Sequence, residues 1–401
     1  MANVSSSNGL EKRPKLRFPG FDEQYKQCRI GDIYAERSQR GATDMELLSV
    51  TMNDGVKPRS EIEGKDNSSE DKSNYKIVRK GDMVYNSMRM WQGANGISPC
   101  DGIVSPAYTV LMPKQEINNG YFAALFKSAN LINEFRKNSQ GMTSDTWNLK
   151  YPQIETIKIQ IPSVSEQDKV SELFGVLDAR IVAQAQLVES LKKYKRGVVR
   201  TLLSPKHCSI KNVKWTTSRI GDIGTFIKGA PLSKADISLE GAPFILYGEL
   251  YTTYSEVISN VVRKTQASVD KQYYSQIGDV IIPTSGETPE EISTASCVML
   301  PDIILAGDLN IYRCTQVDGR IMSYILNHVV NDRIARVAQG KSIVHVQAAE
   351  LSKIEITYPD QVSQKKIIAT LAALTKRIEH SIRELELAQD QRNALLQRLF
   401  I

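Results

Sequence analysis

The sequence has few of the residues and motifs from which catalytic and metal sites are built. Its four histidines have no spacing typical of metal ligands, and no two of its five cysteines form a CxxC pair. The cysteines are Cys28, Cys100, Cys208, Cys297 and Cys314, and the histidines are His207, His328, His345 and His380. An odd number of scattered cysteines argues against a zinc site or a disulfide framework and favours the reducing cytoplasm.

Long apolar runs are also missing. No stretch approaches the ~18 apolar residues of a membrane span, and the small, polar residues at the start predict a disordered tail over 1–24 rather than a signal peptide. The formal net charge of +6 is mild for 401 residues, so it permits nucleic-acid binding without arguing for it. A chain of this length exceeds one ordinary core and predicts two or more domains.

The motifs of common nucleotide and cofactor sites are absent as well. No Pro-Pro dipeptide occurs, which excludes the (Asp/Asn)-Pro-Pro-aromatic motif of adenine methyltransferases, and there is no GxGxxG loop. The segment "ARVAQGKS" at 335–342 departs from the phosphate-binding loop GxxxxGK(S/T) because Ala335 replaces the first glycine. Glu63-Gly64-Lys65 matches the Glu-x-Lys of nucleases, but it lies in a polar stretch that we interpret as a solvated loop. We therefore predict a non-catalytic chain; an NTPase that uses Lys341 is the less favoured alternative.

Several short signals occur twice in the same order. "RIGDI" stands at 29–33 and again at 219–223. Gly81-Asp82 and Gly278-Asp279 lie 197 positions apart, and each precedes an apolar run, which predicts a turn that leads into a strand. Further along, 154–162 aligns with 351–359 in an alternating pattern that ends at a proline and predicts a half-buried strand. The chain is therefore a tandem duplication.

The longest repeated block predicts a long helix in each half. Residues 165–203 align with 363–400 without an insertion, and apolar residues recur every three or four positions in both. The seam residues are Val170, Phe174, Leu177, Ile181, Val188, Leu191, Val198 and Leu202, followed by Ile367, Leu371, Leu374, Ile378, Leu385 and Leu395. We expect the helices to pack antiparallel as a spacer, each about 38 residues and ~57 Å long. A helical hairpin with an unrelated role, or a coiled coil for dimerisation, is the alternative.

The stretches between the repeated blocks carry side chains suited to DNA recognition. Arginine pairs with guanine, side-chain amides with adenine, and hydroxyl groups with phosphate. The candidates in the first half are Arg37, Arg40, Arg59, Asn86, Ser87, Arg89, Trp91, Gln92, Thr143, Ser144 and Trp147. Those in the second half are Lys228, Lys234, Tyr247, Thr284, Ser285, Glu287, Thr288 and Lys341. Each has a plainer alternative as a core residue or an ordinary surface charge.

Over nearly its whole length the chain resembles the specificity subunit of type I restriction–modification systems. The resemblance rests on "PKLRFPGF" (14–21), the "RIGDI" pair, "KGDMVYNSMRMWQGANGISPCDGIVSPAY" (80–108) and the two terminal helical blocks. It implies an α+β chain with two target recognition domains separated by two long antiparallel coiled-coil helices. Each domain would grip one half of a split DNA sequence, and the helices would set the gap. The segment 283–297 lacks the Tyr-Asn-Ser-Met-Arg string, so the two domains should read different half-sites.

The resemblance also implies partners and their cofactors. Two methyltransferase subunits would bring S-adenosylmethionine, and two motor-nuclease subunits would bring ATP and Mg²⁺, so this chain itself would bind no cofactor. The helices, with Leu177, Ile181, Val188, Leu191, Leu374, Ile378, Leu385 and Leu395, would serve as spacer and docking site. The expected domains are 25–163 and 205–361, with helices at 164–204 and 362–401. A two-domain scaffold that binds proteins rather than DNA is the alternative function.

Overall fold

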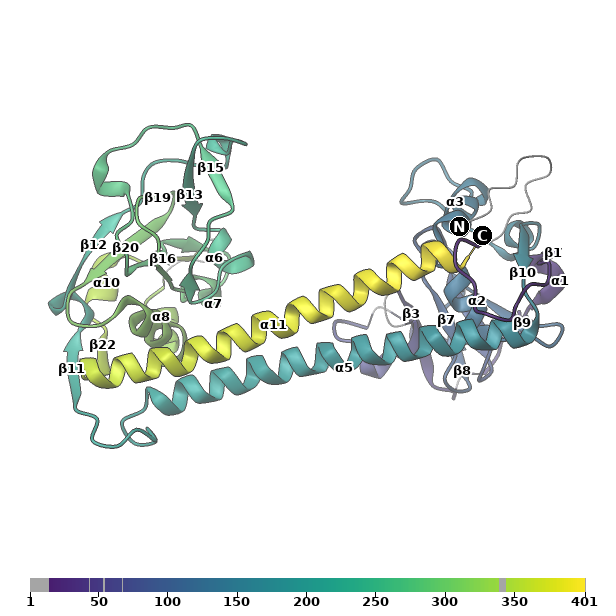
Figure 1. The fold of residues 1–401 in the computed structure, drawn as a ribbon, viewed down its shortest axis with the longest axis horizontal. Coiled ribbons are helices and arrows are strands. Elements are labelled where there is room, and N and C mark those ends of the chain that lie inside the picture. Colours follow the sequence, from purple (N-terminus) through teal and green to yellow (C-terminus); the bar gives the residue numbers. More distant parts are fainter. Residues whose placement is uncertain (1–13, 43, 53–54, 67, 339–343, 401) are drawn as a thin grey trace. The chain divides into compact units, whose positions relative to one another are not determined.

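The computed structural model describes residues 14–42, 44–52, 55–66, 68–338 and 344–400. They form two compact units. Unit 1 comprises Met1–Ala185 and Arg383–Ile401, and unit 2 comprises Gln186–Ile382. Each unit thus contains one end of each of two long helices, α5 (Val164–Leu202) and α11 (Gln361–Leu399), which are shown in Figure 1.

The described residues of unit 1 form three β-sheets. Two are four-stranded, in the orders β2-β9-β6-β7 and β4-β3-β8-β5, and the third pairs β1 with β10. The strands are β1 (Lys26–Arg29), β2 (Tyr34–Glu36), β3 (Leu47–Thr51), β4 (Gly55–Pro58), β5 (Lys76–Val78), β6 (Met83–Asn86), β7 (Asn95–Ile97), β8 (Gly102–Val104), β9 (Tyr108–Pro113) and β10 (Lys158–Ile161). The helices are α1 (Ile30–Ile33), η1 (Arg59–Glu61), η2 (Met90–Gln92), α2 (Asn119–Leu125), α3 (Ala129–Asn138) and α4 (Tyr151–Ile154).

Unit 2 repeats the plan with different sheet sizes. Its sheets have the orders β12-β20-β16-β18-β14, β15-β13-β19, β11-β22 and β17-β21. The strands are β11 (Trp215–Arg219), β12 (Gly224–Lys228), β13 (Ala242–Leu246), β14 (Val257–Ile258), β15 (Arg263–Thr265), β16 (Asp279–Pro283), β17 (Ser285–Gly286), β18 (Ser296–Val298), β19 (Ile304–Ala306), β20 (Leu309–Cys314), β21 (Val344–His345) and β22 (Glu355–Pro359). The helices are η3 (Ile220–Asp222), η4 (Lys234–Asp236), α6 (Glu249–Thr252), η5 (Lys271–Tyr273), α7 (Pro289–Ile292), α8 (Gly319–His328), α9 (Asn331–Val337) and α10 (Ala348–Ser352).

The repeated pentapeptide buries the same two residues, and makes the same backbone hydrogen bond, in both units. Its two isoleucines are buried in both copies, and the backbone N–H of the first donates across the unit, from Ile30 to Ile157 O and from Ile220 to Ile354 O, both at 3.0 Å. A Cβ atom on the glycine of either copy would lie within 3 Å of another residue, Glu155 in unit 1 and Ser352 in unit 2. Only glycine permits this approach, which accounts for the repetition.

The repeated Gly-Asp pair is the predicted turn into a strand. Gly81 and Gly278 both have positive φ, at +91° and +96°, the left-handed conformation that favours glycine. The strands that follow are β6 and β16, and every residue of β16 is buried. An apolar run that is buried on both faces reads as a continuous stretch rather than an alternating one.

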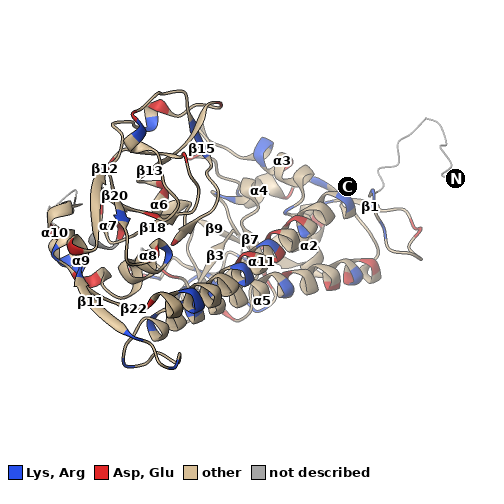
Figure 2. Cartoon of the chain, turned by 60° about the vertical axis from the view of Figure 1, so that its left-hand side comes forward, with Lys and Arg blue, Asp and Glu red and all other residues tan. Residues whose placement is uncertain are grey.

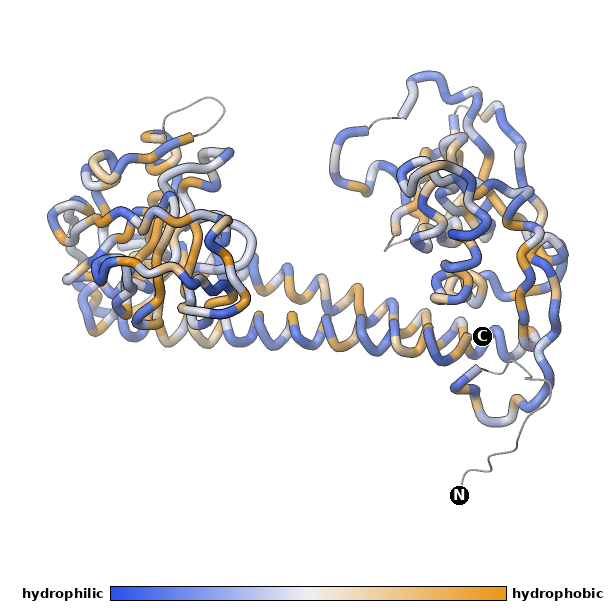
Figure 3. The backbone as a smooth tube through the Cα atoms, turned by 90° about the horizontal axis from the view of Figure 1, so that it is seen from above, coloured by the Kyte–Doolittle hydropathy of each residue, from blue (hydrophilic) through white to orange (hydrophobic). Residues whose placement is uncertain are grey.

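The two long helices each have 39 residues and pack against each other within both units. In unit 1 the start of α5 meets the end of α11, where the rings of Phe174 and Phe400 stack at 5.7 Å and Arg392 pairs with Asp178. In unit 2 the end of α5 shares one core with the start of α11, through Leu202 and Leu371. The helices are therefore antiparallel, as predicted. Figure 3 shows hydrophobic residues recurring between hydrophilic ones along both, the amphipathic pattern of packed helices.

Candidate nucleic-acid interface

In unit 1 two segments that carry predicted DNA-binding residues lie against each other. The backbone N–H of Leu149 donates to Ser87 O at 2.8 Å, which joins the end of β6 to the segment 140–149. The indole rings of Trp91 and Trp147 meet edge to face with their centroids 5.2 Å apart. The structure thus brings together two clusters that are more than 50 positions apart in the sequence.

Unit 2 is joined in the same way. The backbone N–H of Val346 donates to Thr284 O at 3.0 Å, which is the bond between Leu149 and Ser87 repeated 197 positions further along. Next to it, β17 pairs with β21, and Ser285 faces His345. Each unit therefore presents the same two meeting segments, but with different side chains.

The segment 139–149 of unit 1 forms a loop whose middle part, 140–146, is exposed. Gln140 and Asn148 form an antiparallel bridge. The hydroxyl of Thr146 donates to Thr143 O at 3.0 Å. Thr143 and Ser144 are exposed, and the preceding residue, Met142, is fully exposed. These hydroxyl groups can donate to phosphate oxygens.

Arg89 is a predicted contact whose side chain is free to bind DNA. Its side chain is exposed and has no ion pair or hydrogen bond within the described ranges of the chain. Two positions further along the chain, Trp91 has the Arg136 guanidinium 5.8 Å from the centre of its ring. An unpaired guanidinium such as that of Arg89 can contact a base edge or a phosphate.

Several other predicted residues of unit 1 make bonds inside the fold. Ser87 is buried and shares a hydrogen bond with the Thr109 hydroxyl at 2.8 Å, and Trp91 Nε1 donates to Met88 O. Arg59 donates to the carbonyls of its own loop, including Gly64 O at 2.9 Å. The remaining predicted residues of this unit are more open to solvent: Arg40 is exposed, and Asn86 and Gln92 are half-buried.

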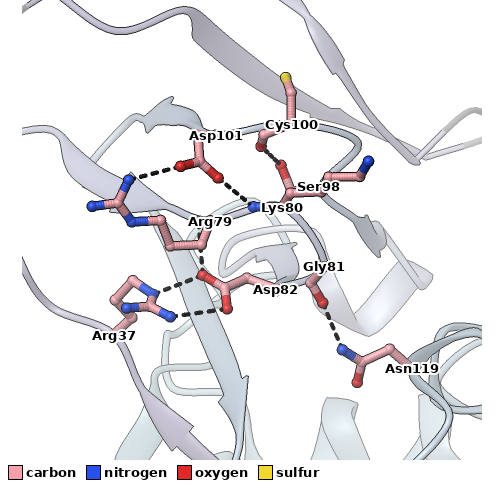
Figure 4. Close-up of polar contacts among 9 residues, drawn as sticks. All are labelled: Arg37, Arg79, Lys80, Gly81, Asp82, Ser98, Cys100, Asp101 and Asn119. Carbon is pink, nitrogen blue, oxygen red and sulfur yellow. Dashed lines mark hydrogen bonds and ion pairs between the residues drawn. The ribbon is translucent and has the colours of Figure 1, made fainter.

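Arg37 is held by a carboxylate, as Figure 4 shows. Its Nε lies 2.7 Å from Oδ2 of Asp82, and its Nη2 lies 3.2 Å from Oδ1. The hydrogen bond that Arg37 donates to Asp82 raises the pKa of Arg37, although partial burial opposes this. Beside it, Asp101 accepts from Arg79 at 2.7 Å and from the Lys80 backbone at 2.8 Å. These pairs shape the turn before β6.

Some of the predicted DNA-binding residues of unit 2 are likewise open to solvent, and others are bonded within the fold. Lys228, Lys234 and Glu287 are exposed, while Tyr247 and Thr284 are half-buried. Ser285 is buried and donates to Asp308 at 2.6 Å. Thr288 caps helix α7 by accepting from the Glu291 N–H at 3.2 Å. Lys341 lies outside the described residues.

Sequence reasoning missed an ion pair in a hollow of unit 2. The hollow has a volume of about 750 Å³, and Lys234 and Tyr247 line it together with Glu249 and Arg263. Arg263 Nε lies 2.8 Å from Glu249 Oε1. The two residues are 14 positions apart and belong to no motif, so nothing in the sequence links them.

The helix residues predicted as spacer and docking positions are all at least partly buried. Val188 and Ile378 are buried, and Leu177, Ile181, Leu191, Leu374, Leu385 and Leu395 are half-buried. Figure 2 shows lysine, arginine and acidic residues interspersed along both helices. The exposed faces are therefore of mixed charge.

The described ranges contain no cluster of three or more histidine, cysteine or acidic side chains that could hold a metal ion. Across the same ranges no helix has the length and apolarity needed to span a membrane. All five cysteines are free thiols.

Comparison with known proteins gives one consistent result. A family model described as the type I restriction modification DNA specificity domain matches residues 23–193 and again residues 212–387. The Type I restriction enzyme MjaVIII specificity subunit of Methanocaldococcus jannaschii is 23% identical over 354 residues, which are 80% of this chain and 79% of that protein.

Solved structures share the fold across almost the full length. The crystal structure of a type I restriction–modification S subunit from M. genitalium has a TM-score of 0.58 at 14% identity, and covers 97% of this chain and 99% of its own. A chain from a structure of the assembly and conformational transition of a type I R-M system has a TM-score of 0.60 at 14% identity, with 95% and 98% covered. The predicted α+β class with two repeated domains and two long helices is confirmed.

Proposed function

The chain belongs to the family of type I restriction modification DNA specificity subunits, whose domain it contains twice, and we propose from this that each unit reads one half of a split DNA target. Specificity subunits recognise DNA and are not catalytic. The chemistry of modification and cleavage would therefore belong to other subunits.

The observation that carries the proposal is the repeated junction between two segments in each unit. The bond from Leu149 to Ser87 and the bond from Val346 to Thr284 place equivalent surfaces on both units. Their side chains differ: unit 1 offers the free Arg89 and the tryptophan pair, whereas unit 2 offers Glu287 and Thr284. Equivalent surfaces with different side chains suit two different half-sites of one target.

We infer that α5 and α11 set the gap between the half-sites. The helices pair at both ends, and a paired helix is stiffer than a loop of the same length. Binding to phosphates would make the affinity sensitive to salt, while base contacts from the two units would set the sequence.

The proposed partners are two methyltransferase subunits and two motor-nuclease subunits, in the cytoplasm. The former would bring S-adenosylmethionine and the latter ATP and Mg²⁺. The mixed-charge outer faces of α5 and α11 support a docking role for the helices.

The test is to reconstitute the chain with its methyltransferase partner and to map modified adenines by methylation-aware sequencing. We expect one motif made of two short parts with a gap of fixed length. Replacing residues 25–163 with the matching domain of a relative should change one part only. A complex that binds DNA without any sequence preference would instead support a protein-binding scaffold.

A separate assay tests the enzymatic alternative. The purified chain should not hydrolyse ATP, and Lys341→Ala should leave that result unchanged. ATP turnover that disappears in the variant would overturn the assignment of a non-catalytic subunit.

A further inference from the structure

Unit 2 has a hollow beside β15, lined by both polar and apolar residues, that contains an ion-paired arginine. The hollow measures about 750 Å³ and is bordered by Lys234, Tyr247, Thr252, Glu249 and Arg263. Its lining includes the end of β13 and the short helix α6, which begins at Glu249. The carboxylate is thus attached to rigid structure.

Glu249 is a buried carboxylate that orients the arginine. Its exposed fraction is 8%, and its two oxygens have separate partners. Oε1 accepts from Arg263 Nε at 2.8 Å, and Oε2 accepts from the Leu246 N–H at 3.3 Å. A buried acid of this kind requires a cation, because burying an unpaired charge is costly.

Arg263 keeps its outer edge open. Half of its side chain is exposed, and within the described chain only Nε is engaged, by Glu249. The two terminal nitrogens of the guanidinium have no partner among the described residues and can donate as a fork, while the bond from Nε to the carboxylate restrains the guanidinium. Because the side chain is already ordered, little rotamer entropy remains to be lost on binding.

We propose that Arg263, oriented by Glu249, reads a guanine in the half-site recognised by unit 2. The inference rests on the proposed function and adds to it the base and the residue. A forked guanidinium matches the O6 and N7 acceptors of guanine, which lie side by side in the major groove.

The same geometry argues against a phosphate as the ligand. The Arg263–Glu249 pair has no net charge, so the carboxylate offsets the attraction of the arginine for an anion. The edge of guanine is uncharged, so its binding depends on the orientation of the donor groups rather than on their net charge. Lys264, the next residue on β15, is exposed and projects to the opposite face of the strand, since side chains alternate. It provides the matched comparison.

The test uses the reconstituted complex with its methyltransferase partner and compares four variants: Arg263→Ala, Arg263→Lys, Glu249→Gln and Lys264→Ala. Arg263→Lys keeps the charge but loses the fork. We expect both Arg263 variants to relax one guanine position of the unit 2 half-site, with discrimination falling about 5- to 150-fold as for the loss of one bidentate contact. Glu249→Gln should relax the same position less. Lys264→Ala should keep the motif.

The outcomes separate the inference from the function on which it rests. A wild-type complex without a two-part motif would overturn both. An intact two-part motif that stays unchanged in both Arg263 variants would overturn the guanine contact alone. Loss of every position in the unit 2 half-site, while the other half-site is kept, would assign Arg263 to folding and would also overturn it. Arg263→Lys distinguishes a folding role from base recognition, because lysine keeps the ion pair with Glu249.

Discussion

Arg37 donates from Nε to Oδ2 of Asp82 at 2.7 Å, across 45 positions of the sequence. In unit 2 the equivalent Asp279 is bound by Arg313, with Nε 3.1 Å from Oδ1. Both aspartates are nearly buried, and both also accept a backbone N–H three residues before them, at 2.9 Å. The aspartate of the repeated Gly-Asp pair therefore closes a turn and binds a guanidinium in each unit.

Removing this carboxylate should destabilise unit 1. Asp82→Ala leaves the partly buried Arg37 without its partner and the Arg79 N–H without an acceptor, so we expect a loss of about 2–3 kcal/mol, somewhat below that of a fully buried pair. The measurement is chemical unfolding. Asp101→Ala is the control, because that carboxylate is half-exposed and should cost less than about 1 kcal/mol. Equal losses for both would contradict a special role for Asp82.

The sequence predicted the repeat but not what the aspartates bind. The Gly-Asp pair can be recognised in the sequence because the two residues are adjacent in both copies of the repeat. The arginine cannot be, because it comes from different strands: Arg37 follows β2, whereas Arg313 lies in β20, which pairs with β16. Residue type alone predicts that Arg37 contacts DNA; this stays a prediction, and in the structure the side chain is bonded to Asp82.

The candidate site was predictable to the same partial extent. Trp91 and Trp147 were each identified from residue type, but their contact depends on the loop folding back onto β6, which no local pattern encodes. Ser87 and Ser285 lie in segments that the sequence singled out, yet both are buried. Strand alternation over so few residues does not reveal which side faces the core. The helices, with several turns of periodic pattern, were predictable to within a few residues.

Two glycines in α5 should be replaceable with a gain in stability. Gly175 and Gly197 lie inside the helix, and a Cβ atom at either position would have nothing within 4 Å. Alanine there should stabilise the chain by about 0.5–1 kcal/mol for each substitution, because it restricts the unfolded backbone. Thermal unfolding measures the effect. Gly31→Ala is the opposite control and should destabilise, since its Cβ atom would meet Glu155 at 2.9 Å.

Acid should weaken unit 2 through Glu256. The side chain accepts from Lys195 of α5 at 2.9 Å and is bonded to His328 Nε2 at 2.8 Å. Burial alone would raise the pKa of Glu256, but the bond to His328 and the charge of Lys195 outweigh it and lower the pKa to about 2. Because the folded pKa lies below the unfolded value of about 4.3, the contribution of the carboxylate is present above that value and is lost as the pH falls toward 2.

The measurement for Glu256 is the free energy of unfolding between pH 6 and pH 3. The wild-type chain should lose about 1.5–2 kcal/mol more than Glu256→Gln over this range. Glu189→Gln removes a carboxylate from an exposed pair on α5, the helix that carries Lys195, and should follow the wild-type curve. Parallel curves for wild type and Glu256→Gln would show that the buried carboxylate does not set the acid sensitivity.

Lengthening both long helices should widen the gap in the DNA target without changing its two parts. Four residues inserted after Ala185 and four after Ile382 add ~6 Å to each helix, which corresponds to about two base pairs at ~3.4 Å each. The insertion sites lie at the unit boundaries, so neither recognition surface is altered. Methylation-aware sequencing of the reconstituted complex should show the same half-sites with a gap longer by one or more base pairs. Inserting four residues in α5 alone shifts its apolar seam relative to that of α11, so the apolar residues no longer meet. This single insertion should therefore impair DNA binding. An unchanged gap in the double insertion would mean that something other than the helices sets the distance.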